Sequence, residues 1–581
     1  MSAEPRRRGP LGGGPLNGGA GPRGLGGIVV AALAFAGLVA LRPRLQERQQ
    51  AAGLVIEGAD TAGMSADIAV PTLALGAFRG LVVDYLWMRS LALREQGRTY
   101  EAWTLAEQIG RLQPRLPAVW GWLGSHLAYD LPPTEDQPQR RWQWIQNGVA
   151  LLRDQGLRYN PDASELYVTI SRIYQDRVNA TFDEFHSAYK TYYIEGALRA
   201  GVQRFSLEEL ATAPSWQALL HDDPEARHVL KKMEEMRGGQ EIFPEVLTTA
   251  LQSLNPEAPQ TQRLVGYLSQ PAGQRLLRSA VAQAVTTLFG LQPEAMLRVD
   301  REWGPLDWQS SFSAAVYWAA LGVEAAQRSH DLRGEIRARR AAVLALKAAL
   351  RQGRVRVTEA GLVRSPNLEL IPRLDRIYAE GVKKAQDEMQ TLARQDDFDP
   401  KELEAASGFK TNQEFARQDF LVEAVILLSE FGRDVEGRAL LQKAHDLYPD
   451  EPALQVPYQD FLIQVVVDKV TDAGAMDTPD SVSQGLLGLW QRAFQFLALG
   501  EDARYRTYER LALARQQRWE AYLRREAQED PSALKRLRVP YAELQRRALE
   551  QAARALPPGF RARLAQRSGV PLDQLLGGQR R

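Results

Sequence analysis

The stretch 97-GRTYEAWTLAEQIGRLQPRLPAVWGWLG-124 decides how this chain is organised. A small residue, Gly97, stands at a turn, a helical run follows it, and Pro114 ends that run. A second helical run then opens with a tryptophan, Trp120. This order of signals predicts pairs of antiparallel helices that repeat along the chain.

The spacing within this stretch is that of a tetratricopeptide unit, a helix pair of about 34 residues that ends in a proline. When Pro114 is the closing proline, Gly97 falls at the turn between the helices and Ala102 falls where they approach closely. Residues 120–124 then match the W-x2-L-G start of the next unit, whereas the first helix carries Leu86, Arg89 and Ser90 where W, L and G would stand. The register is therefore better defined around the proline than at the first helix.

A second copy of the pattern lies far downstream, in residues 416–450. There Gly432 stands at the turn between the helices, and Pro449 is the closing proline. Ala444 occupies the position late in the unit where a small residue is expected. In both copies the proline follows the turn glycine by 17 residues. Because turn glycines and terminal prolines are common in helical hairpins, it is the shared spacing that indicates a repeat.

The rest of the chain also predicts helices, with two kinds of interruption. Residues 205–300 read as helices broken at four prolines and fit no repeat register, so we expect an irregular insertion there. The segment 354-RVRVTEAGLVRS-365 has alternating valines and a turn that ends in Gly361, which predicts a short β-hairpin.

The predicted fold class is all-α: an N-terminal transmembrane helix followed by a tetratricopeptide-like α-solenoid with irregular helical insertions and one short β-hairpin. The predicted parts are a disordered cytoplasmic tail (1–23), a transmembrane helix (24–41), a linker (42–70), helical repeats (71–200), the insertion (201–300), helical hairpins with a repeat unit at 416–449 (301–470) and basic C-terminal helices (481–581).

The first 41 residues carry targeting signals. Residues 1–23 are rich in glycine, proline and arginine, which predicts disorder. Residues 24–41 hold 18 residues without a charge, near the lower limit of about 17 for a membrane-spanning helix, and the arginines before them favour a cytoplasmic N-terminus. A cleaved signal peptide is the alternative, although 38-LVA-40 is a poor cleavage site because leucine is large. We expect an uncleaved single-pass anchor in the bacterial inner membrane, with the body in the periplasm.

The composition and motifs of the sequence exclude several kinds of functional site. The 581 residues include no cysteine, which excludes disulfides, thiolate metal ligands and cysteine nucleophiles. The net charge of +1 argues against a uniformly basic nucleic-acid-binding protein. The chain has no P-loop, no H-E-x-x-H and no G-x-S-x-G motif. We therefore expect no catalytic residue, no cofactor, no metal and no nucleic-acid partner.

Three runs of the sequence resemble segments of a known family: 78-FRGLVVDYLWMRS-90, 157-LRYNPDASELY-167 and 304-GPLDWQSSFSAAVYWA-319. The family is a group of membrane-anchored, tetratricopeptide-like bacterial proteins without an established activity. The resemblance implies an N-terminal anchor and a body of helical repeats. It brings no ligand and no catalytic residue, and it does not reach the last third of the chain.

The predicted working surface is the groove lined by the first helices of the hairpins. Tyr85, Arg89, Trp122 and His126 flank the expected core positions there, and we expect them to face outward and bind a partner protein. The main hypothesis is a membrane-anchored periplasmic scaffold for an unknown protein of the cell envelope. One alternative is an enzyme or ligand-binding protein with a site in residues 201–300, which a deep pocket with converging ionisable groups would favour.

A basic C-terminal region supports the other alternative, a lipid or nucleic-acid binder. Residues 510–581 carry 16 Lys/Arg and 7 Asp/Glu, a balance of +9, so residues 1–509 carry −8. The run 541-YAELQRRALEQAARAL-556 is amphipathic. It suits an anionic lipid surface, an acidic partner or docking on the acidic body of the same chain. We expect this run to dock on the same chain or to form an ordinary solvated face.

Overall fold

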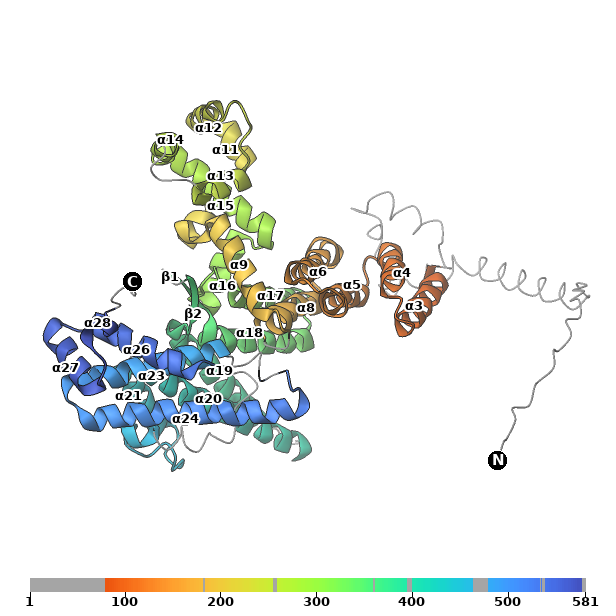
Figure 1. The fold of residues 1–581 in the computed structure, drawn as a ribbon. Helices are drawn as coiled ribbons and strands as arrows, with labels where there is room; N and C mark the ends of the chain where they lie inside the picture. The colour runs from red at the N-terminus through yellow and green to blue at the C-terminus, as the bar shows by residue number, and fades with distance from the viewer. Residues whose placement is uncertain are drawn as a thin grey trace, which may run out of the picture. The chain divides into compact units, whose positions relative to one another are not determined.

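The computed structural model describes residues 79–180, 183–253, 259–358, 361–393, 400–462, 479–532, 534 and 539–576. These residues are mainly helical and include one two-stranded antiparallel sheet (Figure 1). The chain divides into a short unit, Met1–Val82, and a large unit, Val83–Arg581, which holds every contact described below. The predicted disordered tail, transmembrane helix and linker lie outside the described residues. Within those residues no helix combines the length and the apolar character that a membrane span needs.

The helices follow one another in three groups. The first group is α3 (Arg79–Glu95), α4 (Thr99–Leu112), α5 (Pro117–Ser125), α6 (Pro138–Leu151), α7 (Leu157–Tyr159), α8 (Ser164–Ile173) and α9 (His186–Ala200). The second is α10 (Leu207–Ala211), α11 (Trp216–Asp222), α12 (Pro224–Met236), α13 (Pro244–Ser253), α14 (Pro259–Leu268), α15 (Pro271–Phe289) and α16 (Pro293–Trp303). The third is α17 (Ser311–Arg328), α18 (Leu332–Gln352), α19 (Ile371–Ala393), α20 (Pro400–Glu430), α21 (Asp434–Leu447), α23 (Pro479–Leu499), α24 (Asp502–Glu529), α26 (Tyr541–Ala555), α27 (Pro558–Ser568) and α28 (Leu572–Leu575).

The two turn glycines predicted from sequence adopt the same backbone conformation. Gly97 and Gly432 both have a φ of 75°, in the left-handed region that favours glycine. Each glycine is followed by a helix of 14 residues, α4 and α21. These helices end at Gln113 and Tyr448, which have the same φ of −130° and ψ of 65°. The sequence spacing thus corresponds to two hairpins whose turns and ends match.

Trp120 is buried between the helices of neighbouring hairpins. A Cβ added to Gly110 or to Gly156 would come within 3.1 Å of its side chain, so both glycines allow the tryptophan to fit. The indole Nε1 donates a hydrogen bond to the carbonyl oxygen of Pro114 at 2.7 Å. A Cβ added to Gly124 would overlap a leucine of the following hairpin helix. The tryptophan and the glycines therefore permit close packing of α4, α5 and α6.

Several helices of residues 205–300 begin at prolines. The helices α12, α13 and α15 begin at Pro224, Pro244 and Pro271, where proline has no hydrogen bond to lose. After the insertion, α17 and α18 pack against α8 (Figure 1). The hydroxyl of Ser171 in α8 donates to the carbonyl oxygen of Ala315 in α17 at 2.7 Å. The chain after the insertion therefore returns to pack on α8.

The predicted β-hairpin is confirmed as β1 (Arg354–Thr358) and β2 (Gly361–Ser365). Its antiparallel register pairs Arg354 with Ser365 and Thr358 with Gly361. A carboxylate oxygen of Asp307 accepts a hydrogen bond from the backbone N–H of Val355 at 2.8 Å. This bond ties the hairpin to the segment before α17.

The basic C-terminal helices pack on their own chain. The helices α24, α26 and α27 all contact α23. The apolar side of α26, which includes Leu544, Ala548 and Ala552, is buried. The amphipathic run predicted at 541–556 therefore uses its apolar side within the chain, and only its polar side is left for other molecules.

Candidate binding cleft

The four residues predicted to line the groove do not share one exposed surface. Tyr85 is 62% exposed and Arg89 is exposed as well. Trp122 is half-buried, and its ring stacks on His126 with ring centres 5.5 Å apart. His126 is only 2% exposed, and its Nδ1 lies 2.7 Å from a carboxylate oxygen of Asp130. The prediction that His126 faces outward is wrong, because the ring of Trp122 covers the imidazole and Asp130 pairs with its Nδ1.

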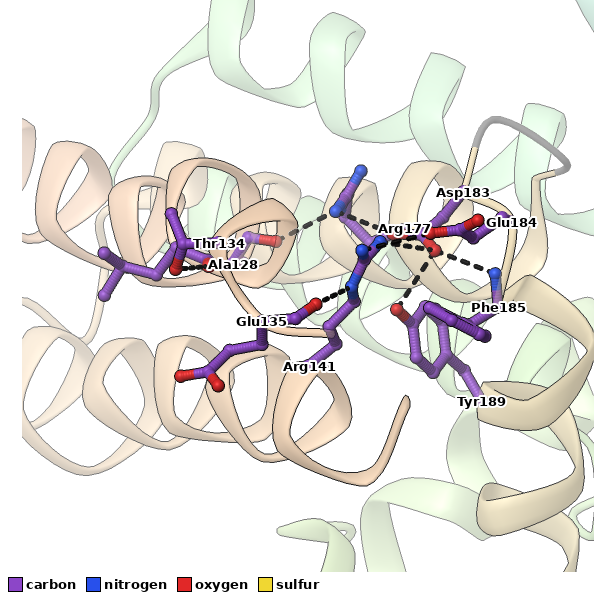
Figure 2. Close-up of polar contacts among 10 residues, drawn as sticks. Ala128, Thr134, Glu135, Arg141, Arg177, Asp183, Glu184, Phe185 and Tyr189 are labelled. Carbon is purple, nitrogen blue, oxygen red and sulfur yellow. Dashed lines mark hydrogen bonds and ion pairs between the residues drawn. The ribbon is translucent and has the colours of Figure 1, made fainter. Parts of the chain in front are cut away.

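A second candidate is a group of charged residues around Asp183 (Figure 2). The carboxylate of Asp183 is nearly inaccessible to solvent and lies at the start of the segment that leads into α9. It accepts hydrogen bonds from Arg177 at 3.0 Å, from the Tyr189 hydroxyl at 3.1 Å and from the backbone N–H of Phe185 at 2.9 Å. Burial raises the pKa of Tyr189, and the negative charge of Asp183 raises it further.

Arg141 completes this group and balances its charge. Its guanidinium lies 3.6 Å from Asp183 and 3.0 Å from Glu184, and it donates to the carbonyl oxygen of Glu135 at 2.6 Å (Figure 2). Two arginines thus face two carboxylates. A buried group whose charges are paired and hydrogen-bonded has a structural role. This charged group fastens the segment before α9 to α6 and to the turn that precedes α6.

A cavity of about 430 Å³ lies between the insertion and the β-hairpin, where the alternative enzyme site was predicted. Burial raises the pKa of Asp300 and of Asp307, which both line it. Asp300 accepts from the backbone N–H of Leu306 at 2.8 Å and from the indole of Trp308 at 3.2 Å. Asp307 accepts from Val355. Both carboxylates therefore hold the segment before α17, and the described part of the chain places no three His, Asp or Glu side chains where they could bind a metal.

A larger cleft, of about 1180 Å³, opens between the β-hairpin, the α20–α21 turn, α23 and α26. Seven arginines, three carboxylates and no lysine line it, which gives a formal charge of +4. We call it the arginine cleft. Its arginines are Arg354, Arg356 and Arg364 of the hairpin, Arg433 and Arg492 near the α20–α21 turn, and Arg547 and Arg554 of α26.

The arginines of the cleft differ in how they are paired. Arg364 pairs with Asp480, and Arg433 pairs with Glu436 and Glu369. By contrast, Arg356, Arg547 and Arg554 form no ion pair with any residue of the described ranges; Arg356 and Arg554 are exposed and Arg547 is half-buried. Their positive charge is therefore not neutralised by the part of the protein that the structure describes.

Some polar atoms of the cleft-lining residues are buried without a hydrogen-bond partner in the described part of the chain. These atoms are Nη1 of Arg364, Oγ of Ser365, Nε of Arg492 and Oδ1 of Asn367. A buried donor or acceptor without a partner costs about 1–3 kcal/mol, so such atoms are rare in folded proteins.

Comparison with known proteins does not identify the chain. No protein-family model matches it, and no curated protein is significantly similar to it. The functional assignment therefore depends on the fold and on the chemistry of the arginine cleft.

Proposed function

We propose that this protein is a membrane-anchored helical-repeat scaffold that holds a partner protein of the cell envelope at the arginine cleft. The observation that carries the proposal is the uncompensated charge of the cleft, where the half-buried Arg547 and the exposed Arg554 of α26 form no ion pair within the described residues. Surface arginines are frequent in protein interfaces, because a guanidinium binds carboxylates in a fork and also packs on apolar surface.

The helical body suits a scaffold. Stacked hairpins expose long surfaces to which a peptide or a helix can bind, and each hairpin is held mainly by its neighbours. We assign the hairpins α3–α4 and α20–α21 to the tetratricopeptide-like type. Support for this assignment comes from their matching turns and from their ion pairs, Arg98 with Glu101 and Arg433 with Glu436, which join equivalent positions.

The membrane attachment is part of the same proposal. It is supported by the uncharged residues 24–41 and by the arginines that precede them. In this arrangement residues 42–581 lie in the periplasm and are tethered to the inner membrane by an uncleaved anchor.

The test is recovery of the partner after chemical crosslinking in intact cells, followed by purification from membranes and mass spectrometry. Three forms of the full-length protein are compared: wild type, Arg547→Ala with Arg554→Ala, and Tyr85→Ala with Arg89→Ala. The proposal expects a partner with the wild type and with the α3 variant, and its loss from the cleft variant. A partner that stays with the cleft variant and leaves the α3 variant would place binding at the groove instead.

A further inference from the structure

We infer that the arginine cleft recognises an acidic peptide segment, rich in Asp and Glu, of the partner protein. This inference rests on the proposed binding function of the cleft and names the chemistry of the ligand. The cations of the cleft are all arginines, whose planar guanidinium groups match the two oxygens of a carboxylate.

The polar side chains of α26 form a line along the cleft. Arg547, Gln551 and Arg554 all line it and are spaced at i, i+4 and i+7, so they share one side of the helix. The two arginines are about 10 Å apart along the helix axis, at a rise of about 1.5 Å per residue. That distance is spanned by about three residues of an extended peptide or by two turns of a helix.

The helix on which α26 packs, α23, adds hydrogen-bonding amides to the lining. Gln484, Gln491 and Gln495 line the cleft from α23, and Gln491 donates to Gln551 of α26. An amide side chain both donates and accepts, so this row can bond to the N–H and C=O groups of a peptide backbone. Arginines for the acidic side chains and glutamines for the backbone together favour a peptide.

Other polyanions fit this lining less well. Proteins that bind single-stranded nucleic acid stack bases on aromatic side chains, and the residues that line the cleft include one aromatic residue, Phe431. Anionic lipids need an apolar surface for their acyl chains, whereas 11 of the 26 lining residues are arginine or glutamine. The lining therefore matches an acidic peptide better than a nucleic acid or a lipid.

The test measures fluorescence anisotropy of a labelled 12-residue peptide of alternating Glu and Ser with the full-length protein in neutral detergent. A peptide with Gln in place of Glu, and an oligodeoxythymidine of similar length, are measured in parallel. We expect the Glu peptide to bind, the Gln peptide to bind at least about ten-fold more weakly, and binding of the Glu peptide to weaken as salt rises.

Two matched variants locate the site. Arg547→Ala with Arg554→Ala removes two charges inside the cleft, and Arg546→Ala with Arg563→Ala removes two exposed charges outside it. We expect the first to weaken binding of the Glu peptide by about ten-fold or more and the second by less than about two-fold. Circular dichroism during heating checks that both variants fold like the wild type.

The outcomes separate this inference from the proposed function. Equal losses of Glu-peptide binding in the two variants, or none in either, would overturn the inference. Tighter binding of the oligodeoxythymidine, lost in the first variant alone, would assign the cleft to nucleic acid and overturn it as well. Loss of the Glu peptide from the first variant, while the cellular partner stays with that variant, would support the inference and contradict the proposed function.

Discussion

Gly97 and Gly432 hold the same left-handed backbone conformation, each with a φ of 75°, at turns between antiparallel helices. In both hairpins an arginine follows the glycine and pairs with a glutamate three residues later. The ion pairs are exposed and contribute little stability, about 0.2–1 kcal/mol each. The requirement for glycine comes from the backbone, because other residues lose about 1–2 kcal/mol in this conformation.

The turn predicts a destabilised variant. Gly97→Ala should lower the free energy of unfolding by about 1–2 kcal/mol, because the left-handed φ strains alanine while the added Cβ meets no atom within 4 Å. Gly408→Ala is the matched control, since Gly408 lies inside α20 and its Cβ also meets nothing. The control should gain about 0.5–1 kcal/mol, because alanine favours a helix. Urea unfolding measures the stability of both variants. Equal stabilisation of the two would mean that Gly97 does not adopt the left-handed conformation.

The packing around Trp120 predicts larger losses. Trp120→Ala should cost about 3–5 kcal/mol, because it empties the space between Gly110 and Gly156. Ala102→Leu should cost about 1–3 kcal/mol, because Ala102 is fully buried and the helices have no room for a larger side chain. Met88→Ala, at a residue 64% exposed, should change stability by less than about 0.5 kcal/mol. Thermal unfolding of the three variants tests this order, and similar melting of all three would contradict the register.

The buried charge group predicts a strong effect of one carboxylate. Asp183→Asn leaves Arg177 and Arg141 without their shared negative partner, so it should cost about 3–5 kcal/mol. Glu101→Gln breaks an exposed ion pair and should cost at most about 1 kcal/mol. Urea unfolding of both variants provides the measurement. If Asp183→Asn proves no more costly than Glu101→Gln, the group does not fasten α9 to α6.

A buried lysine predicts how stability changes with pH. The pKa of Lys190 is lowered to about 7, mainly by burial and also by the positive charge of Arg364, while Asp480 opposes this change. An unfolded lysine has a pKa of about 10.4. Between these values the unfolded chain binds a proton that the folded chain lacks, so stability should rise with pH from about 7 towards 10. Buried tyrosines lower the stability as pH rises, but only above about pH 10. Burial raises their pKa, and that of Tyr174 is raised to about 12.

The test is urea unfolding at pH 7, 8 and 9. Lys190→Met should stabilise the protein most at pH 7 and remove much of the rise with pH. Lys383→Met, at an exposed lysine, should leave the slope unchanged. A slope that survives in Lys190→Met would assign the pH dependence to other groups.

Local signals in the sequence were enough to predict the helical fold, the β-hairpin and the helix starts in the insertion. Gly97 and Pro224 act through their own backbone, so their effect can be predicted without knowledge of distant residues. The orientation of His126 was not predictable in this way, because it depends on the stacked ring of Trp122 and on a π-helical turn from His126 to Asp130.

The arginine cleft was missed for a related reason. Both of its halves were noticed in the sequence: Arg354 and Arg356 lie in the predicted hairpin, and Arg547 and Arg554 lie in the basic C-terminal region. No periodicity connects segments so far apart along the chain. The packing of α26 on α23 brings them to one cleft, and only the tertiary structure shows that packing.

The most direct test of the central claim is site-specific photo-crosslinking in living cells, with a photoreactive amino acid at Gln495 in the cleft. The same amino acid at Arg337, an exposed residue of α18, is the control. We expect a discrete crosslinked product from Gln495, none from Arg337, and loss of the product when Arg547→Ala and Arg554→Ala are added. A product from Gln495 that persists in that variant, or a product from Tyr85 with none from Gln495, would contradict the claim that the arginine cleft holds the partner.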